Sequence, residues 1–125
     1  MNKKVILVIR VLFGMMMIGL GVLGFMKLPI PDYPAAPKSF LIALSNTGYI
    51  NYAIELIFII AGLMFVSGRY VALGALLLAP IIVNILLFHI FLDIKSIPLA
   101  VVVALLNIFI AYTERDKYKP LFVSK

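Results

Sequence analysis

Four long apolar stretches constrain the fold of this chain more than any other feature. A helix needs about 20 mainly apolar residues to cross the hydrocarbon core of a bilayer. Backbone polar groups inside a bilayer must be paired within the protein, and helices and closed barrels are the spanning structures that achieve this. The sequence therefore predicts an all-α integral membrane protein, an antiparallel four-helix bundle in a single domain over residues 1–125. The four expected spans cover about residues 5–26, 48–66, 70–91 and 97–112.

The composition agrees with a membrane protein. The chain is 65% hydrophobic and only 13% charged, whereas soluble domains carry about 25% charged residues. The absence of cysteine excludes disulfides, iron–sulfur clusters and thiol redox chemistry within this chain. A net charge of +6 is typical of basic residues at helix ends beside anionic headgroups. Membrane lipid is therefore an expected partner, and nucleic acid is not.

The basic residues predict how the bundle is oriented in the membrane. With four spans, the two ends of the chain lie on the same side as the turn between the second and third spans. That side carries seven lysines and arginines, and the opposite side carries three. Short cytoplasmic loops are enriched in these residues. We therefore expect both termini in the cytoplasm, with a cytoplasmic tail over residues 113–125 and an external loop over residues 27–47.

The external loop is expected to contain a short helix. Its first part holds four prolines, which disfavour a helix and favour an extended segment. Residues 39–47 then predict a helix that ends near Gly48 and is too short to span a membrane. This helix is either a connector lying on the lipid or a lid over an outward-facing cavity, and the sequence leaves both open. The prolines are Pro29, Pro31, Pro34 and Pro37.

Polar side chains inside the spans indicate a candidate site. Such residues are rare on lipid-facing surfaces and mark bundle interiors or cavities. At 1.5 Å per residue, Glu55 and Asn84 lie about 10 Å below the outer end of their spans, and Asn107 about 13–15 Å. This similarity of depth on three helices predicts a ligand-binding pocket in the outer half of the bundle. Asn51 lies one turn above Glu55 and could bond its carboxyl or line a passage outward.

Pro80 is expected to shape that pocket. It cannot donate a backbone hydrogen bond, so the carbonyl of Leu76 loses its helical partner and the helix should kink. Asn84 follows one turn later on the same face. The pair indicates either a small polar pocket, which we favour, or a packed kink with an amide bond across helices worth about 1 kcal/mol.

The only histidine and the only intramembrane cation each have two interpretations. His89 lies about 3 Å from the outer end. It is either an interfacial residue paired with Asp93 or headgroups, or a proton relay or gate that titrates near neutral pH. Arg10 enters the membrane from the cytoplasmic side, so pairing with Glu55 is not expected. We expect Arg10 to extend to the headgroups or to reach Glu114.

No catalytic residue is assigned from the sequence. One histidine and one intramembrane glutamate are too few for a metal site. The chain has no glycine-rich phosphate loop, no HExxH and no nucleophile motif. Gly14 and Gly21 share one face of the first span, which indicates close helix packing.

Two long stretches resemble a known family. "VIRVLFGMMMIGLGVLGFMKL" and "IELIFIIAGLMFVSGRYVALGALLLAPIIVNILLFHIF" are similar to the DoxX-like family of small four-helix membrane proteins. The resemblance implies a bacterial inner-membrane protein with a left-handed bundle. It also implies, loosely, an association with thiosulfate:quinone oxidoreductase, redox-stress complexes or assembly. The residues that carry it are Arg10, a glycine ridge ending in Lys27, Glu55, Arg69, Pro80, Asn84 and His89.

These observations lead to one main hypothesis and two alternatives. The main hypothesis is a redox-accessory subunit that binds an amphipathic molecule, a quinone or a lipid, in the outer half of the bundle. The alternatives are a structural or assembly protein without ligand chemistry, and a minimal proton-linked transporter. A partner protein or a second copy is compatible with each of them. The expected ligand-binding residues are Glu55, Asn84, His89, Asn51 and Asn107.

Overall fold

The computed structural model describes residues 2–26 and 33–125, and the secondary structure of this part of the chain consists of helices, without strands. Four segments are long and apolar enough to cross a membrane, the last of them combining η1 with α5. The ends of the four long α-helices lie within two residues of those expected for the spans. The elements are α1 (Lys3–Phe25), α2 (Ala35–Asn46), α3 (Ile50–Ser67), α4 (Val71–Leu92), η1 (Ile94–Ser96), α5 (Ile97–Thr113), η2 (Arg115–Lys117) and η3 (Lys119–Phe122).

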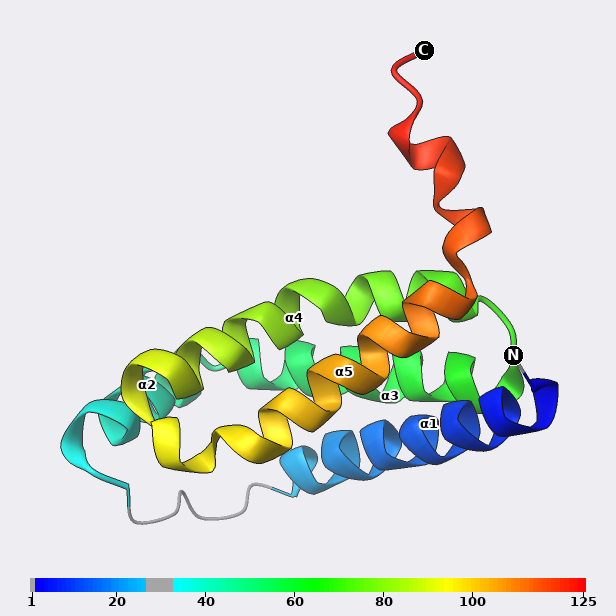
Figure 1. Cartoon of the computed structure of the whole chain (residues 1–125). Coiled ribbons are helices and arrows are strands. Elements are labelled where there is room, and N and C mark those ends of the chain that lie inside the picture. Colours follow the sequence, from blue (N-terminus) through cyan, green and yellow to red (C-terminus); the bar gives the residue numbers. More distant parts are fainter. Residues whose placement is uncertain (1, 27–32) are drawn as a thin grey trace.

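The four long helices lie side by side, and consecutive ones run in opposite directions (Figure 1). The turn between α3 and α4 lies at the end where α1 begins and α5 ends, which we call the turn end. The opposite end carries α2, and we call it the α2 end. Gly68 closes α3 in the left-handed conformation, with φ of 75°, and its N–H donates to the carbonyl oxygen of Met64 at 3.0 Å. Glycine favours this conformation because it has no Cβ.

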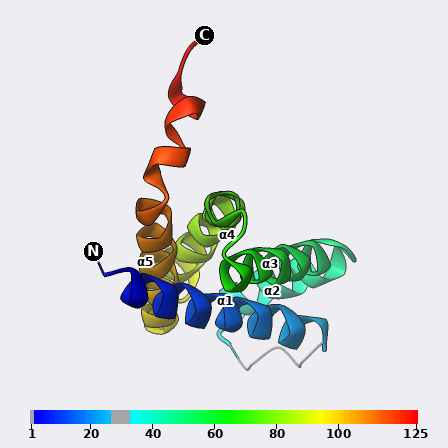
Figure 2. The same ribbon diagram turned by 90° about the vertical axis from the view of Figure 1, so that its right-hand side faces the viewer.

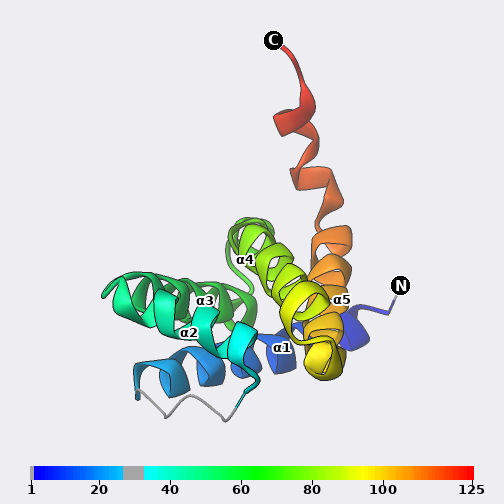
Figure 3. The same ribbon diagram turned by 90° about the vertical axis from the view of Figure 1, so that its left-hand side faces the viewer.

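The helices pack as two pairs joined through α3 and α4. α1 packs mainly on α3, α5 packs on α4, and α1 and α5 make a smaller contact. Figures 2 and 3 show α1 running obliquely from the α5 side of the bundle to a position below α3. Gly14 and Gly62 allow a close approach, because a Cβ on Gly14 would lie 2.8 Å from the carbonyl oxygen of Gly62. The expected packing role of Gly14 is confirmed.

The hydrophobic core lies nearer the turn end. Phe13 of α1 and Phe65 of α3 stack there with ring centroids 5.4 Å apart, and both are fully buried. By contrast, none of the residues 50–60 of α3 or 83–92 of α4 is fully buried in the described part of the chain. α3 and α4 are therefore more deeply buried near the turn end than toward α2.

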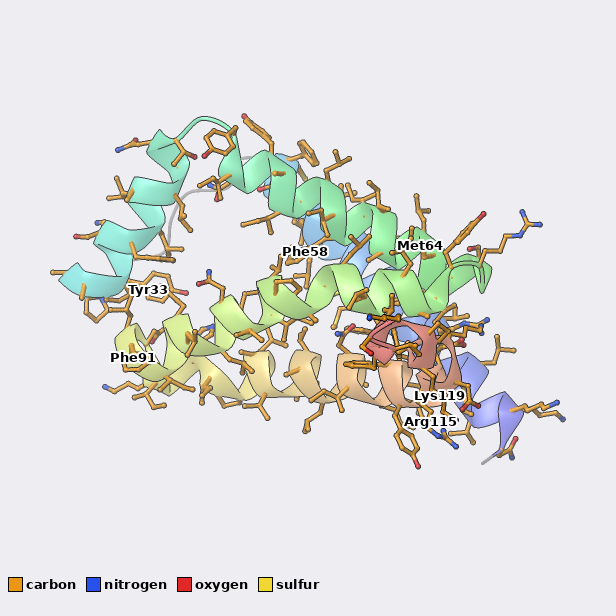
Figure 4. All side chains as sticks on the ribbon, turned by 90° about the horizontal axis from the view of Figure 1, so that it is seen from above. Tyr33, Phe58, Met64, Phe91, Arg115 and Lys119 are labelled. Carbon is orange, nitrogen blue, oxygen red and sulfur yellow. The ribbon has the colours of Figure 1, made fainter. Side chains whose placement is uncertain are left out.

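α2 bridges the separated ends of α3 and α4. It contacts both helices, and Figure 4 shows it lying across their ends, with Tyr33 beside the start of α2 and Phe58 between α3 and α4. Phe40 of α2 packs on Phe88 of α4 with ring centroids 5.2 Å apart. These contacts show that α2 is packed on the bundle, whether it serves as a connector or as a lid.

α2 begins earlier than expected, at Ala35 rather than at residue 39. The expectation that the prolines exclude a helix was wrong for Pro37, which is buried in the first turn. The first N–H groups of a helix have no intrahelical acceptor, so proline removes no helical bond there. Pro29 and Pro31 lie outside the described residues, as does Lys27.

Candidate functional site

Arg10 binds the end of α3. Its Nε donates to the carbonyl oxygen of Phe65 at 2.9 Å, and its guanidinium lies over Gly68, where an added Cβ would be 2.9 Å from Nη2. The last carbonyls of a helix lack intrahelical partners, and a cation is favourable beside them. The expected alternative of a contact with Glu114 is not formed, whereas contact of Arg10 with headgroups stays a prediction. Glu114 pairs instead with Lys117.

Asn107 also bonds the backbone of a neighbouring helix. Its side chain is buried, and Nδ2 donates to the carbonyl oxygen of Ala75 in α4 at 3.1 Å. Ala75 lies nine residues from Asn84, about 13 Å nearer the turn end by helical rise. The expected similarity of depth between Asn107 and Asn84 was therefore wrong. Depth counted from each helix end ignores how far neighbouring helices are offset and tilted.

Glu55 lies in the interface between α1 and α3, near the α2 end. A Cβ on Gly24 of α1 would lie 2.5 Å from its Cδ, and one on Gly21 would lie 2.7 Å from its backbone oxygen. The carboxyl therefore occupies space left by the missing side chain of Gly24. Its Oε2 is buried and has no hydrogen-bond partner within the residues that the structure describes. Among the described residues of the α1–α3 interface, Glu55 is the one with a buried side-chain oxygen that lacks a partner.

The other predicted residues at the α2 end do not join Glu55 in one polar cluster. Asn84 is exposed on α4 and makes no hydrogen bond with any described residue. Asn51 is half-buried one turn before Glu55, yet no described hydrogen bond joins the two side chains. Glu55 faces α1, which does not pack on α4. A shared Glu55–Asn84 pocket is therefore not formed by direct contact, and a ligand-binding role for each residue stays a prediction.

His89 is paired with Asp93 at the α2 end of α4. Its Nδ1 lies 3.2 Å from the carbonyl oxygen and 3.8 Å from Oδ2 of Asp93. Both side chains are largely buried, at 15% and 10% exposed. The rings of His89 and Phe88 meet nearly at a right angle, with centroids 5.1 Å apart, and Phe88 in turn contacts Phe40 of α2. The expected pairing with Asp93 is confirmed, and the pair lies beside the α2 contact.

Pro80 lies inside α4 without ending it. The helix is continuous from Val71 to Leu92, and Figure 1 shows it curving toward the α2 end. Within the described ranges, no group of three or more histidine and carboxylate side chains could hold a metal ion. A shallow apolar hollow of about 240 Å³ lies on α1 near the turn end, away from the residues above, and is lined by Lys4, Val5, Val8 and Ile9.

Two of these contacts were not predicted, that of Glu55 with Gly24 and that of Tyr118 with α4. Gly24 provides the space for the Glu55 carboxyl, and its spacing of three from Gly21 along one helix face was the available signal. Tyr118 donates its hydroxyl to the carbonyl oxygen of Ala72 at 2.6 Å. No local pattern indicated this second contact, because it joins positions 46 residues apart.

Comparison with known proteins adds one relative. No protein-family model matches the chain, and no solved structure matches it significantly. The "Uncharacterized protein YwoB" of Bacillus subtilis (strain 168) is 33% identical over 92 residues, which are 70% of this chain and 59% of that protein. The chain thus spans about three fifths of the length of the curated relative it matches. That name states no activity, so the resemblance to the DoxX-like family stays a prediction.

Proposed function

We propose that this chain is a multi-pass membrane protein that binds an amphipathic molecule, a quinone or a lipid, beside Glu55. The observation that carries the proposal is Oε2 of Glu55, which is buried between α1 and α3 without a partner among the described residues. An unpaired polar group in hydrocarbon is costly, and ionisable residues within spans mark functional positions by default. A bound molecule would supply the missing partner.

The chemistry of a carboxyl group fits both ligand classes. In its ionised form Glu55 accepts a hydrogen bond from the hydroxyl of a quinol or of a lipid headgroup. In its neutral form it donates one to a quinone carbonyl. At positions 21 and 24 of α1, the space left by the missing side chains is filled by Ile59 and by Glu55 itself, so the carboxyl is held at the interface between the two helices.

The packing of the bundle supports a site at the α2 end. Neither α3 over residues 50–60 nor α4 over residues 83–92 has a fully buried residue there, in the described part of the chain. His89 with Asp93, Asn51 and the exposed Asn84 are the further polar groups that a headgroup could meet. By the distribution of basic residues, this end faces outward from a bacterial inner membrane and the turn end faces the cytoplasm. The resemblance to DoxX-like proteins favours a redox-accessory subunit and a quinone.

The test compares three proteins purified in mild detergent: the wild type, Glu55→Gln and Asn107→Leu. Mass spectrometry and absorbance identify and quantify co-purified quinone and lipid. We expect one near-stoichiometric ligand in the wild type and in Asn107→Leu, and at least a tenfold lower content in Glu55→Gln. Equal content in all three proteins would contradict the proposal. Unfolding of Glu55→Gln would instead assign this carboxyl a structural role.

A structural or assembly protein is the second candidate, and two contacts favour it. Arg10 and Asn107 both use their polar groups to bond the backbone of a neighbouring helix. Polar side chains in membranes often serve only to bind helices together. In that case every polar substitution would change stability, and none would change the content of a specific bound molecule.

A further inference from the structure

The segment after α5 leaves the bundle in a different direction from the four long helices. This segment, residues 114–125, contains η2 and η3, and we call it the tail. Figure 1 shows it turning away from the bundle axis at the turn end. If the long helices cross the membrane as proposed above, the tail runs along the membrane surface. The inference below rests on that crossing and adds a lipid-binding role for this segment.

The start of the tail is held by side-chain contacts. Tyr118 donates its hydroxyl to the carbonyl oxygen of Ala72, in the first turn of α4, at 2.6 Å. The guanidinium carbon of Arg115 lies 4.4 Å from the ring centroid of Tyr112, and its Nη1 donates to the carbonyl oxygen of Tyr112 at 3.0 Å. In Figure 4, Arg115 and Lys119 lie at the turn end. These contacts tie the tail to α4 and α5 and set its direction.

The far part of the tail presents apolar side chains without cover. Phe122 is 87% exposed, and Leu121 and Val123 are each 65% exposed. Three consecutive apolar residues in water are unfavourable. A segment with apolar residues beside basic ones is typical of the boundary between headgroups and acyl chains. Transfer of these exposed apolar side chains from water into the membrane surface is therefore favourable.

The charge of the chain is concentrated at the same end. The turn end and the tail carry eight basic and two acidic residues, whereas the rest of the sequence carries three of each. The eight basic residues are Lys3, Lys4, Arg10, Arg69, Arg115, Lys117, Lys119 and Lys125. The net charge of +6 thus belongs to this end alone. Within the tail, Glu114 and Asp116 are paired with Lys117 and Lys119, which leaves a basic excess. Anionic phospholipid is the charge-complementary surface.

We propose that the tail lies in the headgroup layer of an anionic bilayer, with Leu121, Phe122 and Val123 inserted and its net positive charge facing the lipid phosphates. Each basic residue at an anionic surface contributes about 1 kcal/mol, or about fivefold in association. The contact of Tyr118 with α4 positions the inserted residues beside the bundle. The partner is a lipid surface rather than another protein.

The absence of tryptophan provides a direct probe. Phe122→Trp places the only indole at the most exposed apolar position of the tail. The full chain is reconstituted in nanodiscs of phosphatidylcholine, with or without phosphatidylglycerol, and quenching by brominated lipid is measured. We expect a blue-shifted emission and stronger quenching with phosphatidylglycerol. Adding Lys117→Gln and Lys119→Gln should weaken tail association about fivefold per lysine. Lys38→Gln with Lys95→Gln, the same charge change at the α2 end, should leave it unchanged.

The possible results distinguish a failure of the tail proposal from a failure of the proposed membrane crossing. Release of the protein from membranes by alkaline carbonate would overturn the membrane crossing itself. If the protein stays in the membrane but its indole is exposed to water in both lipid mixtures, only the tail proposal is overturned. Equal burial of the indole in both mixtures would overturn the recognition of anionic lipid. An indole exposed in nanodiscs but buried in native membranes would identify a protein partner in place of lipid.

Discussion

Gly14 of α1 and Gly62 of α3 face each other across the helix interface in reciprocal contact. A Cβ added to Gly62 would lie 2.6 Å from the carbonyl oxygen of Gly14, and one on Gly14 would lie 2.8 Å from that of Gly62. These distances are shorter than side chains tolerate, so only glycine permits this approach. Membrane helices associate through such close backbone contact, because lipid tails compete equally for larger apolar side chains.

The first prediction concerns this contact. Gly14→Ala should force α1 and α3 apart and lower the free energy of unfolding by about 1–3 kcal/mol. Gly19→Ala is the matched control, because a Cβ at Gly19 meets nothing within 4 Å. Unfolding by titration with a denaturing detergent measures both. Equal destabilisation by the two substitutions would contradict the close packing.

A second prediction concerns the end of α3. Arg10→Met removes the hydrogen bond from Nε to the carbonyl oxygen of Phe65. Hydrogen bonds from charged groups contribute about 1.5–3 kcal/mol, and we expect a loss of stability in that range. Arg10→Lys should recover part of the loss, because a cation remains beside the helix end. A stable Arg10→Met protein would show that solvent replaces the bond.

Asn107 and Asn84 should differ in their effect on stability. Asn107→Leu removes the buried bond to Ala75 and should cost about 0.6–2 kcal/mol. Asn84→Leu replaces an exposed amide that makes no described hydrogen bond, so the free energy of unfolding should change less. The same detergent titration compares the two variants. A larger loss for Asn84→Leu would mean that this amide has a partner in the folded protein.

The contact of Tyr118 should depend on pH. Burial of its ring, and secondarily the charge of Glu114, raise the pKa of Tyr118 above its usual value. The docked tail therefore favours the protonated phenol, which donates to Ala72. Docking should be at full strength below the ordinary tyrosine pKa of about 10 and weaken as the pH rises through the raised pKa.

Spin labelling can measure this release. The chain has no cysteine, so Ser124→Cys provides a single labelling position on the tail. Label mobility should be low at neutral pH and increase in strongly alkaline buffer. Tyr118→Phe should increase mobility already at neutral pH, with a loss of about 0.5–1.5 kcal/mol, and remove the pH dependence. Unchanged mobility in Tyr118→Phe would exclude this bond as the anchor.

The α2 region shows how far local sequence rules reach. The short helix after the first span was predicted from Gly48 and the apolar residues before it. The predicted start is too late, because proline disfavours the interior of a helix but fits the first turn, where Pro37 lies. Local sequence patterns predict that a helix is present. Whether a proline disrupts that helix depends on the position of the proline within it.

The sequence by itself determined the four apolar helices, their ends and the concentration of positive charge at one end. These properties depend on hydropathy, helix length and the order of residues along the chain. Only the tertiary structure decided which polar groups meet: Arg10 with Phe65, Asn107 with Ala75, and Glu55 with Gly24. These pairs depend on how each helix is rotated and offset against its neighbour. The rotation and offset of two helices depend on how their side-chain surfaces pack together. The sequence of one helix alone does not determine that packing.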